Sequence, residues 1–418
     1  MFPATMNKLK LLVGGLVLLA VASCKSDEED GIVVDMLPKT RSIDLTEAQK
    51  EYIKKNNDFS FNLFKTINQQ PKEAQSVICS PISVTYILGM LHDGATGTTA
   101  KEISSLLGFG SQNASEINEL CKALIEGAPE TDENVTLKIA NYLAVNWGET
   151  LLGKFQDDMD YYYHAGMASL DFTSPVAVKA INDWCSKQTE GVIPEIVDRL
   201  PLDTKLVLMN AIYFKANWTN KFDPKDTKTE PFTLESGSNK ELPMMHRKGA
   251  VLCSSNNTFT TIRLPYGSGD RWSMYVMLPN EGKTVDDVIS NLSAGQWSKT
   301  DFNAETVDIK IPRFSLSSDI DLKPVISEMG APSLFSIDAQ LTNICEKKQL
   351  FVTLMKQKAS IEVNEEGSKM AATTIAAETE SGALFLNGGD FHCTHPFVYL
   401  IQESSSGAIF FIGTFRGE

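Results

Sequence analysis

The sequence predicts one large α+β domain in which helices come first and strands follow. Apolar side chains recur at helical spacing between residues 46 and 107. Residues 206–214 and 272–278 are instead continuous apolar runs, which are typical of strands buried on both faces. The composition is that of a globular protein, with 42% hydrophobic and 22% charged residues in a chain of 418. No internal repeat or linker follows residue 45, so we expect a single domain over residues 45–418.

Charge and cysteine content exclude several classes of protein. The net charge is −15, and a general nucleic-acid binder would need a basic surface instead. Seven cysteines are too few for a disulfide scaffold in a chain of this length. Because the six beyond residue 24 lack metal-ligand or redox spacing, we expect buried thiols there.

The first residues predict a targeting segment rather than folded structure. Lys8 and Lys10 precede an apolar run over residues 11–21, which is too short to span a membrane but suits a signal-peptide core. The run ends in Val21-Ala22-Ser23-Cys24, which resembles the lipobox of bacterial lipoproteins. The resemblance implies removal of residues 1–23 and lipidation of Cys24. An ordinary signal peptide with a cysteine near its cleavage site is the alternative.

The stretch after Cys24 is acidic and predicts a solvated tether over residues 24–44. It also resembles surface-export signals of some Gram-negative bacteria. We therefore expect a protein held at the outer membrane or cell surface through its lipid alone.

Individual elements follow from local signals. A helix is expected over residues 46–69, and Ser80-Pro81 should open a second, since serine caps helices and proline suits their first position. A third should run from Thr98 to Leu107 and end at Gly108. Beyond these helices, strands are predicted at 206–214, 272–278, 307–311 and 359–363, with a C-terminal hairpin formed by 397–401 and 408–413.

A search for enzyme chemistry finds no catalytic motif. HExxH, CxxC, Walker A and GxSxG patterns are all missing from the sequence. His392, Cys393 and His395 are metal-ligand residue types, but no fourth ligand stands nearby. We interpret them as part of a loop, and expect no metal and no cofactor.

Residues 365–395 do not fit an ordinary connection. They lie between two predicted strands, and about 30 residues greatly exceeds the usual length of a loop. The first half is small, β-branched and poor in charge, which is typical of a strand that is ready to pair.

At this point the chain resembles the serpin family of serine protease inhibitors. Motifs in the family's order extend over about residues 46–418, and together they are highly specific. They are Val77–Ser83, Leu208–Trp218 with Phe222-Asp223-Pro224 and Thr227, Glu365–Ser368, His395-Pro396-Phe397 and Phe411-Ile412-Gly413.

The resemblance implies a fold of three β-sheets, eight or nine helices and a long exposed reactive-centre loop at about 365–395. It implies a suicide inhibitor and not an enzyme: a target serine or cysteine endopeptidase cleaves the loop, forms an acyl-enzyme, and is trapped as the loop inserts into the main sheet. The implied hinge residues are Glu365, Gly367, Ser368, Met370, Ala371, Ala372, Thr373 and Thr374.

Strand insertion requires a period of two, and this sequence satisfies it. Ser368, Met370, Ala372, Thr374 and Ala376 form one uncharged face, while Lys369 falls on the other. The family usually has alanine at 370 and glutamate at 369, so we expect slower insertion. A loop that never inserts is the alternative.

Other site residues carry over position by position. Trp218 and Arg313 match the place where the sheet opens, and Arg313 is expected to pair with Glu365 near the surface. Ser80, Ser83 and Asn210 match the polar cluster under the sheet centre, where Gln357 replaces the family's usual histidine.

The sequence leaves more than one position for the scissile bond. Counting from Glu365 by the family's spacing places it between Ser381 and Gly382, whereas counting back from Phe397 gives Phe385. Leu384 or Phe385 would suit a chymotrypsin-like protease, Glu380 a glutamyl-specific one, and nearby alanines an elastase-like one. A trypsin-like target is excluded because residues 370–394 contain no lysine or arginine.

Two other classes of function remain. A non-inhibitory carrier with the same fold would bind a ligand at the cell surface, and a glycan-binding lipoprotein would need exposed aromatic side chains. A hydrolase has the weakest support. We expect a monomer whose partner is the target endopeptidase.

Overall fold

The computed structural model describes residues 40–70, 75–110, 114–201, 203–269, 271–345, 350–368 and 389–417. Nine α-helices lie within these ranges: α1 Glu47–Gln69, α2 Pro81–Gly94, α3 Gly97–Leu106, α4 Ala114–Gly127, α5 Gly153–Tyr163, α6 Pro175–Gln188, α7 Val285–Asn291, α8 Ala294–Trp297 and α9 Leu322–Glu328. The strands are β1 Val77–Cys79, β2 Val135–Asn146, β3 Gly166–Leu170, β4 Leu206–Asn217, β5 Lys228–Thr233, β6 Asn239–Ser255, β7 Phe259–Tyr266, β8 Trp272–Pro279, β9 Asn303–Pro312, β10 Phe314–Asp321, β11 Val352–Val363, β12 Gly367–Ser368, β13 Asp390–His392, β14 Phe397–Glu403 and β15 Ile409–Phe415.

The three helices expected from the sequence are confirmed, and their ends follow from local chemistry. Thr46 caps α1 in a capping box with Gln49, in which each side chain accepts from the other residue's backbone. Ser80 caps α2 with Pro81 in the first helical position. Just beyond α3, Gly108 has a φ of 78°, a left-handed conformation that glycine adopts without strain.

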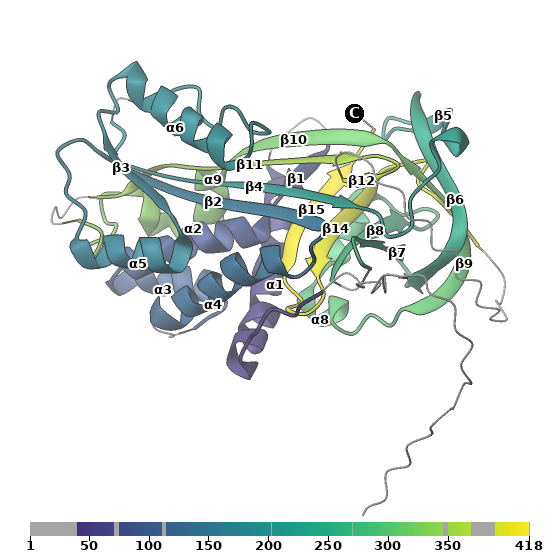
Figure 1. Ribbon diagram of the computed structural model, residues 1–418, viewed down its shortest axis with the longest axis horizontal. Helices are drawn as coiled ribbons and strands as arrows, with labels where there is room; N and C mark the ends of the chain where they lie inside the picture. Colours follow the sequence, from purple (N-terminus) through teal and green to yellow (C-terminus); the bar gives the residue numbers. More distant parts are fainter. Residues whose placement is uncertain are drawn as a thin grey trace, which may run out of the picture. The chain divides into compact units, whose positions relative to one another are not determined.

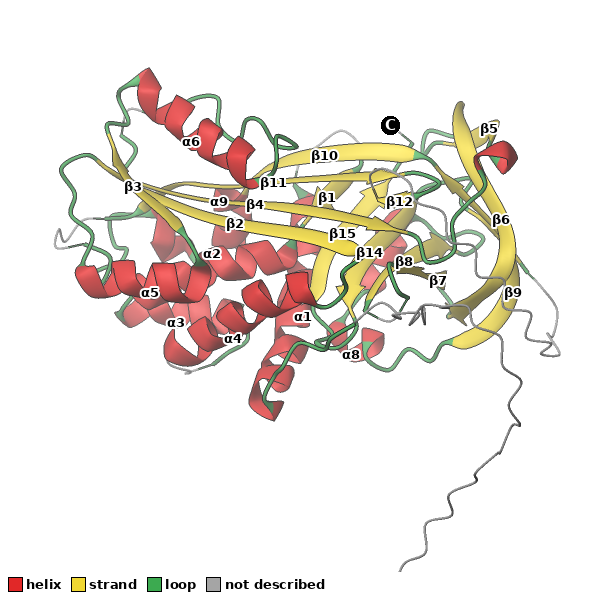
Figure 2. Ribbon diagram, viewed as in Figure 1, coloured by secondary structure: helices red, strands yellow, loops and turns green. Residues whose placement is uncertain are grey.

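The main sheet has the strand order β10-β11-β4-β2-β3, with β12 paired to β4. Successive residues of β4 join two different hydrophobic clusters: Leu206 and Leu208 belong to one, and Val207 and Met209 to the other. Helix α6 covers one face of the sheet, and α2, α4 and α5 lie on the opposite side (Figures 1 and 2). Burial of β4 on both faces therefore explains its continuous apolar sequence, as predicted.

The second sheet has the order β1-β15-β14-β8-β7-β6-β9-β13, and β5 pairs with β6. It contains the predicted C-terminal hairpin, since β14 and β15 pair antiparallel. Three sheets were expected, but hydrogen bonds join the described strands into two. The 17-residue strand β6 explains the difference, because it pairs with β5 and β9 and then continues to pair with β7.

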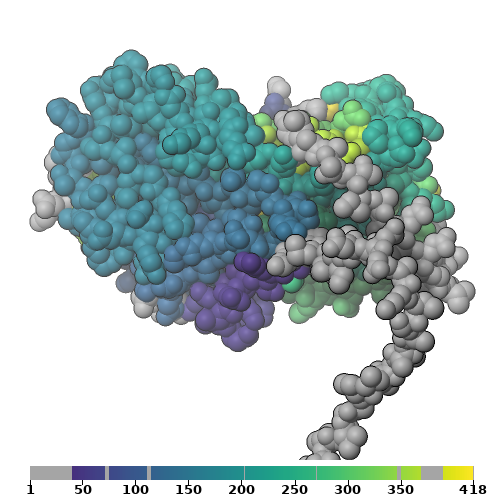
Figure 3. All heavy atoms as spheres, viewed as in Figure 1, coloured from purple at the N-terminus to yellow at the C-terminus, as the bar shows by residue number. Residues whose placement is uncertain are grey.

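On the surface, α1 adjoins α4 (Figure 3), where the Tyr52 hydroxyl donates to Glu116 at 2.8 Å. In the described ranges, no helix combines the length and the apolar character that a membrane crossing requires.

Candidate functional site

The candidate site lies where β11 and β4 diverge. The two strands pair in parallel from Val352 to Ala359, opposite Leu206 to Ile212. Farther along, the chain leaves β11, reverses, and returns as β12 beside the end of β4, where Gly367 and Ser368 pair antiparallel with Asn217 and Ala216 (Figure 1). The other edge of β4 is occupied by β2 throughout. Strand β12 therefore starts a new strand on the β11 side of β4.

This arrangement corrects the extent of the predicted loop. Residues 365–368 were expected in an exposed loop, but Glu365 is 5% exposed and Ser368 is 1% exposed. At the other end, Asp390–His392 form β13, which pairs in parallel with β9. Short strands near both ends of the 365–395 segment thus belong to sheets.

The reversal is fixed by backbone groups just beyond β4. The Trp218 amide donates to the Glu366 carbonyl at 2.8 Å, and the Phe222 amide to the Glu365 carbonyl at 3.1 Å. The Trp218 indole donates to the Asn364 carbonyl at 2.9 Å. Gly367 has a φ of 141°, and a Cβ there would lie 2.2 Å from the carbonyl oxygen of Ala216. Only glycine fits this turn.

Ser368 occupies the first inward position of the new strand. Its hydroxyl shares a 3.0 Å hydrogen bond with the hydroxyl of Tyr266, which is fully buried. The Tyr266 ring stacks on Trp218, with centroids 4.3 Å apart and planes 11° apart. Burial raises the pKa of Tyr266, so the phenol stays neutral. Residue 368 is therefore held in a closed aromatic site, on the face that the period of two predicted to be buried.

The predicted contact between Arg313 and Glu365 is present. The Arg313 Nε donates to Glu365 at 3.1 Å, the Arg313 Nη2 bonds to its other oxygen, and the Thr227 hydroxyl donates to it at 2.6 Å. The pair was expected near the surface, but only the Arg313 side chain is exposed, at 47%, against 7% for Glu365. Burial opposes ionisation of Glu365, yet the bonds from Arg313 and Thr227 outweigh it and hold its pKa below the ordinary value. Nearby, Lys221 forms an ion pair with Glu366.

Lower in the sheet, the predicted polar cluster divides into two hydrogen-bonded groups. The Gln357 side chain accepts from the Ser80 amide at 2.9 Å and donates to the Ser80 carbonyl at 2.7 Å, while the Ser80 and Ser83 hydroxyls lie 2.9 Å apart. Asn210 lies opposite Gln357 in register and donates to Asn141 at 2.8 Å. All five side chains are buried. Gln357 thus stands where the family usually has histidine, and both its carbonyl oxygen and its amide group form hydrogen bonds with Ser80.

Two residues of the site were missed by sequence reasoning. Asn141 lies in the middle of β2, directly opposite Asn210, and the available signal was a polar residue inside an apolar segment. Tyr266 gave no local signal, because its role depends on the long-range contact with Ser368.

Several predicted site residues lie outside the described ranges. They are Cys24, the hinge residues Met370, Ala371, Ala372, Thr373 and Thr374, and the scissile-bond candidates Glu380, Ser381, Gly382, Leu384 and Phe385.

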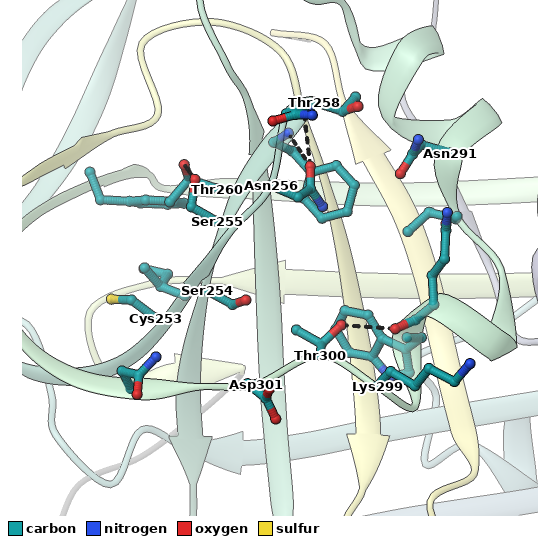
Figure 4. A pocket seen from close by; sticks show the side chains of 18 of the residues that line it. Cys253, Ser254, Ser255, Asn256, Thr258, Thr260, Asn291, Lys299, Thr300 and Asp301 are labelled. Carbon is teal, nitrogen blue, oxygen red and sulfur yellow. Dashed lines mark hydrogen bonds between the residues drawn. The ribbon is translucent and has the colours of Figure 1, made fainter.

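A groove of about 1030 Å³ lies beside β13 and was not predicted. Figure 4 shows its polar lining, which includes Ser254, Ser255, Asn256 and Thr258; the Asn256 carboxamide accepts from the Thr258 amide at 2.7 Å. The lining contains serines, a cysteine, carboxylates and Lys299, but no histidine.

The comparisons with known proteins agree with this geometry. The sequence profile of the family described as Serpin (serine protease inhibitor) matches residues 54–417. Mouse neuroserpin is 30% identical over 371 residues, covering 85% of this chain and 89% of its own. Pig leukocyte elastase inhibitor is 33% identical over 376 residues, covering 86% and 97%. Human thyroxine-binding globulin superposes with a TM-score of 0.79 at 27% identity, covering 88% and 100%.

The chain belongs to the serpin family. Proteins of this family are generally protease inhibitors rather than enzymes, although the family includes a carrier, thyroxine-binding globulin, which has been solved in complex with thyroxine.

Proposed function

We propose that the chain is a covalent suicide inhibitor of serine endopeptidases, extending to cysteine endopeptidases, whose cleaved loop inserts between β11 and β4. The observation that carries the proposal is β12, which already pairs antiparallel with β4 at the mouth of that position. A strand that continued past Ser368 in the same direction would lie between β11 and β4, which are parallel to each other.

The energetics of the sheet favour such insertion. A strand between β11 and β4 would run antiparallel to both, and antiparallel pairing is slightly more stable per residue than the parallel pairing it would replace. The inward set that begins with Ser368 is uncharged in sequence, so its burial needs no ion to be desolvated.

Trapping requires that the protease form an acyl-enzyme with the loop and that insertion then prevent its hydrolysis. The protease nucleophile attacks the carbonyl carbon of the scissile bond, an acyl bond to the protease forms, and the peptide C–N bond breaks as the new amine takes a proton. Insertion of the loop carries the acylated protease away before water can hydrolyse the ester.

An elastase-like or chymotrypsin-like target fits the loop sequence. Residues 380–385 offer alanine, leucine and phenylalanine but no basic residue, and a relative at 33% identity is named leukocyte elastase inhibitor. Ser381–Gly382 remains our first choice of bond. We further propose that lipidated Cys24 and the acidic tether hold the inhibitor at a bacterial surface, where it would block host or competitor proteases.

The test uses residues 25–418 mixed with elastase-like and chymotrypsin-like proteases. We expect a band stable to boiling at the summed mass on a denaturing gel, and the mass of the released C-terminal peptide gives the bond. Cleavage in the loop with no such band for every protease would refute inhibition of those targets. If the cleaved protein also melted at the uncleaved temperature, the loop would not insert, and a carrier function would replace the proposal.

A further inference from the structure

We propose that His246, Asp308 and His392, with Asp390 beside them, form a binding site for a divalent transition-metal ion, zinc being the best match, that ties β13 to β9 and β6. The sequence predicted no metal site, because only His392 of these residues belongs to the short histidine–cysteine segment. Its partners come from two other strands.

The four side chains meet because β9 lies between β6 and β13. His246 and His392 both stand opposite Lys310 in register, one on each side of it, and Asp390 stands opposite Asp308. Residues that are paired across strands, or two apart along one strand, share a face of the sheet. All four side chains therefore project from the same face of three adjacent strands.

The ligand atoms of the other three side chains lie around the Asp308 carboxylate. The Nε2 atoms of His246 and His392 lie 3.0 Å and 2.9 Å from the same oxygen of Asp308. One ligand atom each of Asp308, Asp390 and His392 lies within 4.8 Å of the others. Around a tetrahedral zinc ion with bonds of about 2.0–2.2 Å, neighbouring ligand atoms are about 3.3 Å apart. Small rotations of these side chains would accommodate the ion.

The chemistry of the donors suits zinc, which binds imidazole nitrogen and carboxylate oxygen. The side chains of His246, Asp308 and His392 are 30–35% exposed, so an ion can reach them from solvent. The neighbouring lysine does not occupy the site, because the Lys310 Nζ turns to the Glu230 carboxylate at 2.7 Å.

Metal binding here would hold the strand that follows the loop. Strand β13 has three residues and is the end strand of its sheet. An ion bridging it to β9 and β6 binds only the arrangement in which β13 is docked, and so stabilises that arrangement by mass action. This consequence does not depend on protease inhibition.

The test titrates Zn²⁺ into untagged residues 25–418 after chelator treatment, by calorimetry, with Co²⁺ absorption as a second readout of the ligand set. We expect one ion per chain and a higher melting temperature with Zn²⁺ than without. His392→Ala and His246→Ala should each weaken binding by at least about tenfold, since even the outer partners of a metal site contribute that much.

His164→Ala is the matched control. His164 also places its Nε2 2.9 Å from a carboxylate oxygen, that of Glu126, but on the helical part of the chain, so its loss should leave zinc affinity unchanged. A melting curve recorded without metal shows whether each variant is folded. Because the two variants lie on different strands, one of them can still test the proposal if the other does not fold. The proposal is overturned if the wild type shows no saturable binding, or if folded His246→Ala and His392→Ala bind Zn²⁺ as tightly as the wild type.

Discussion

Replacing Ser368 by arginine is the sharpest test of whether the new strand must be buried. The serine is 1% exposed and its hydroxyl lies 3.0 Å from that of fully buried Tyr266, under a ring stacked on Trp218. Among the described residues, the hydrogen bond of the Ser368 hydroxyl goes to Tyr266 and not to a carboxylate. A guanidinium placed there would be buried without a partner, which costs several kcal/mol.

The matched control, Ser368→Ala, removes only one hydrogen bond. It leaves the buried Tyr266 hydroxyl without its serine partner, a loss of about 1–2 kcal/mol with no change of charge. Both variants have the same backbone requirement, so the difference between them isolates burial of the charge.

The assay follows the fate of the protease. The uncleaved variant can keep the arginine in solvent if the two-residue strand β12 leaves β4, whereas the inserted strand must bury it. If this difference raises the barrier to insertion by about 3 kcal/mol, the ratio of trapping to release falls roughly 150-fold. Ser368→Arg should then be cleaved without forming a band stable to boiling, and its cleaved form should melt close to the uncleaved one. Ser368→Ala should still trap the protease and gain heat stability on cleavage.

One result would refute the reasoning. If Ser368→Arg traps protease in the wild-type ratio, and its cleaved form melts as high as cleaved wild type, then residue 368 is not buried in the trapped state. The observed contact with Tyr266 would then be irrelevant to the mechanism.

Four further predictions concern stability and local structure. Arg313→Ala should lower the free energy of unfolding by about 1–2 kcal/mol, because it leaves the Glu365 carboxylate buried with a hydroxyl partner alone. Since the pKa of Glu365 is lowered on folding, its ionised form stabilises the protein at pH values above the ordinary pKa of 4.5. In urea titrations, the difference in the free energy of unfolding between wild type and Glu365→Gln should therefore vanish as the pH falls through the lowered pKa. Gly367→Ala should displace β12, since its Cβ would lie 2.2 Å from a backbone oxygen of β4, and hydrogen exchange at the end of β4 should rise; unchanged protection would contradict this. Gln357→Leu should destabilise by about 2–4 kcal/mol in denaturant, because the Ser80 amide and carbonyl both lose buried partners.

Local signals in the sequence predicted the elements well, because helix caps and apolar runs act over a few residues. Thr46 and Ser80 begin helices as expected, and the apolar run of β4 is buried on both faces. The resemblance supplied the positions of Arg313 and Glu365, and the contact expected between them is present.

What could not be predicted depends on register between distant strands. The return of β12 to β4 joins residues about 150 positions apart, and nothing local distinguishes it from an exposed loop. The contact of Ser368 with Tyr266 and the convergence of His246 with His392 on Asp308 have the same origin. Each arises only once three strands are aligned, whereas a single sequence shows spacing along one strand.

The described structure also indicates where the sheet carries unfavourable free energy. On the boundary between β4 and β11, the buried Oδ1 of Asn210 has no hydrogen-bond partner within the described ranges. A buried acceptor left unpaired costs about 1–3 kcal/mol. It stands opposite Gln357, where the two strands would have to separate for a new strand to enter. In the proposed mechanism this boundary opens where one buried side-chain acceptor is already unpaired, so fewer side-chain hydrogen bonds are lost there on opening.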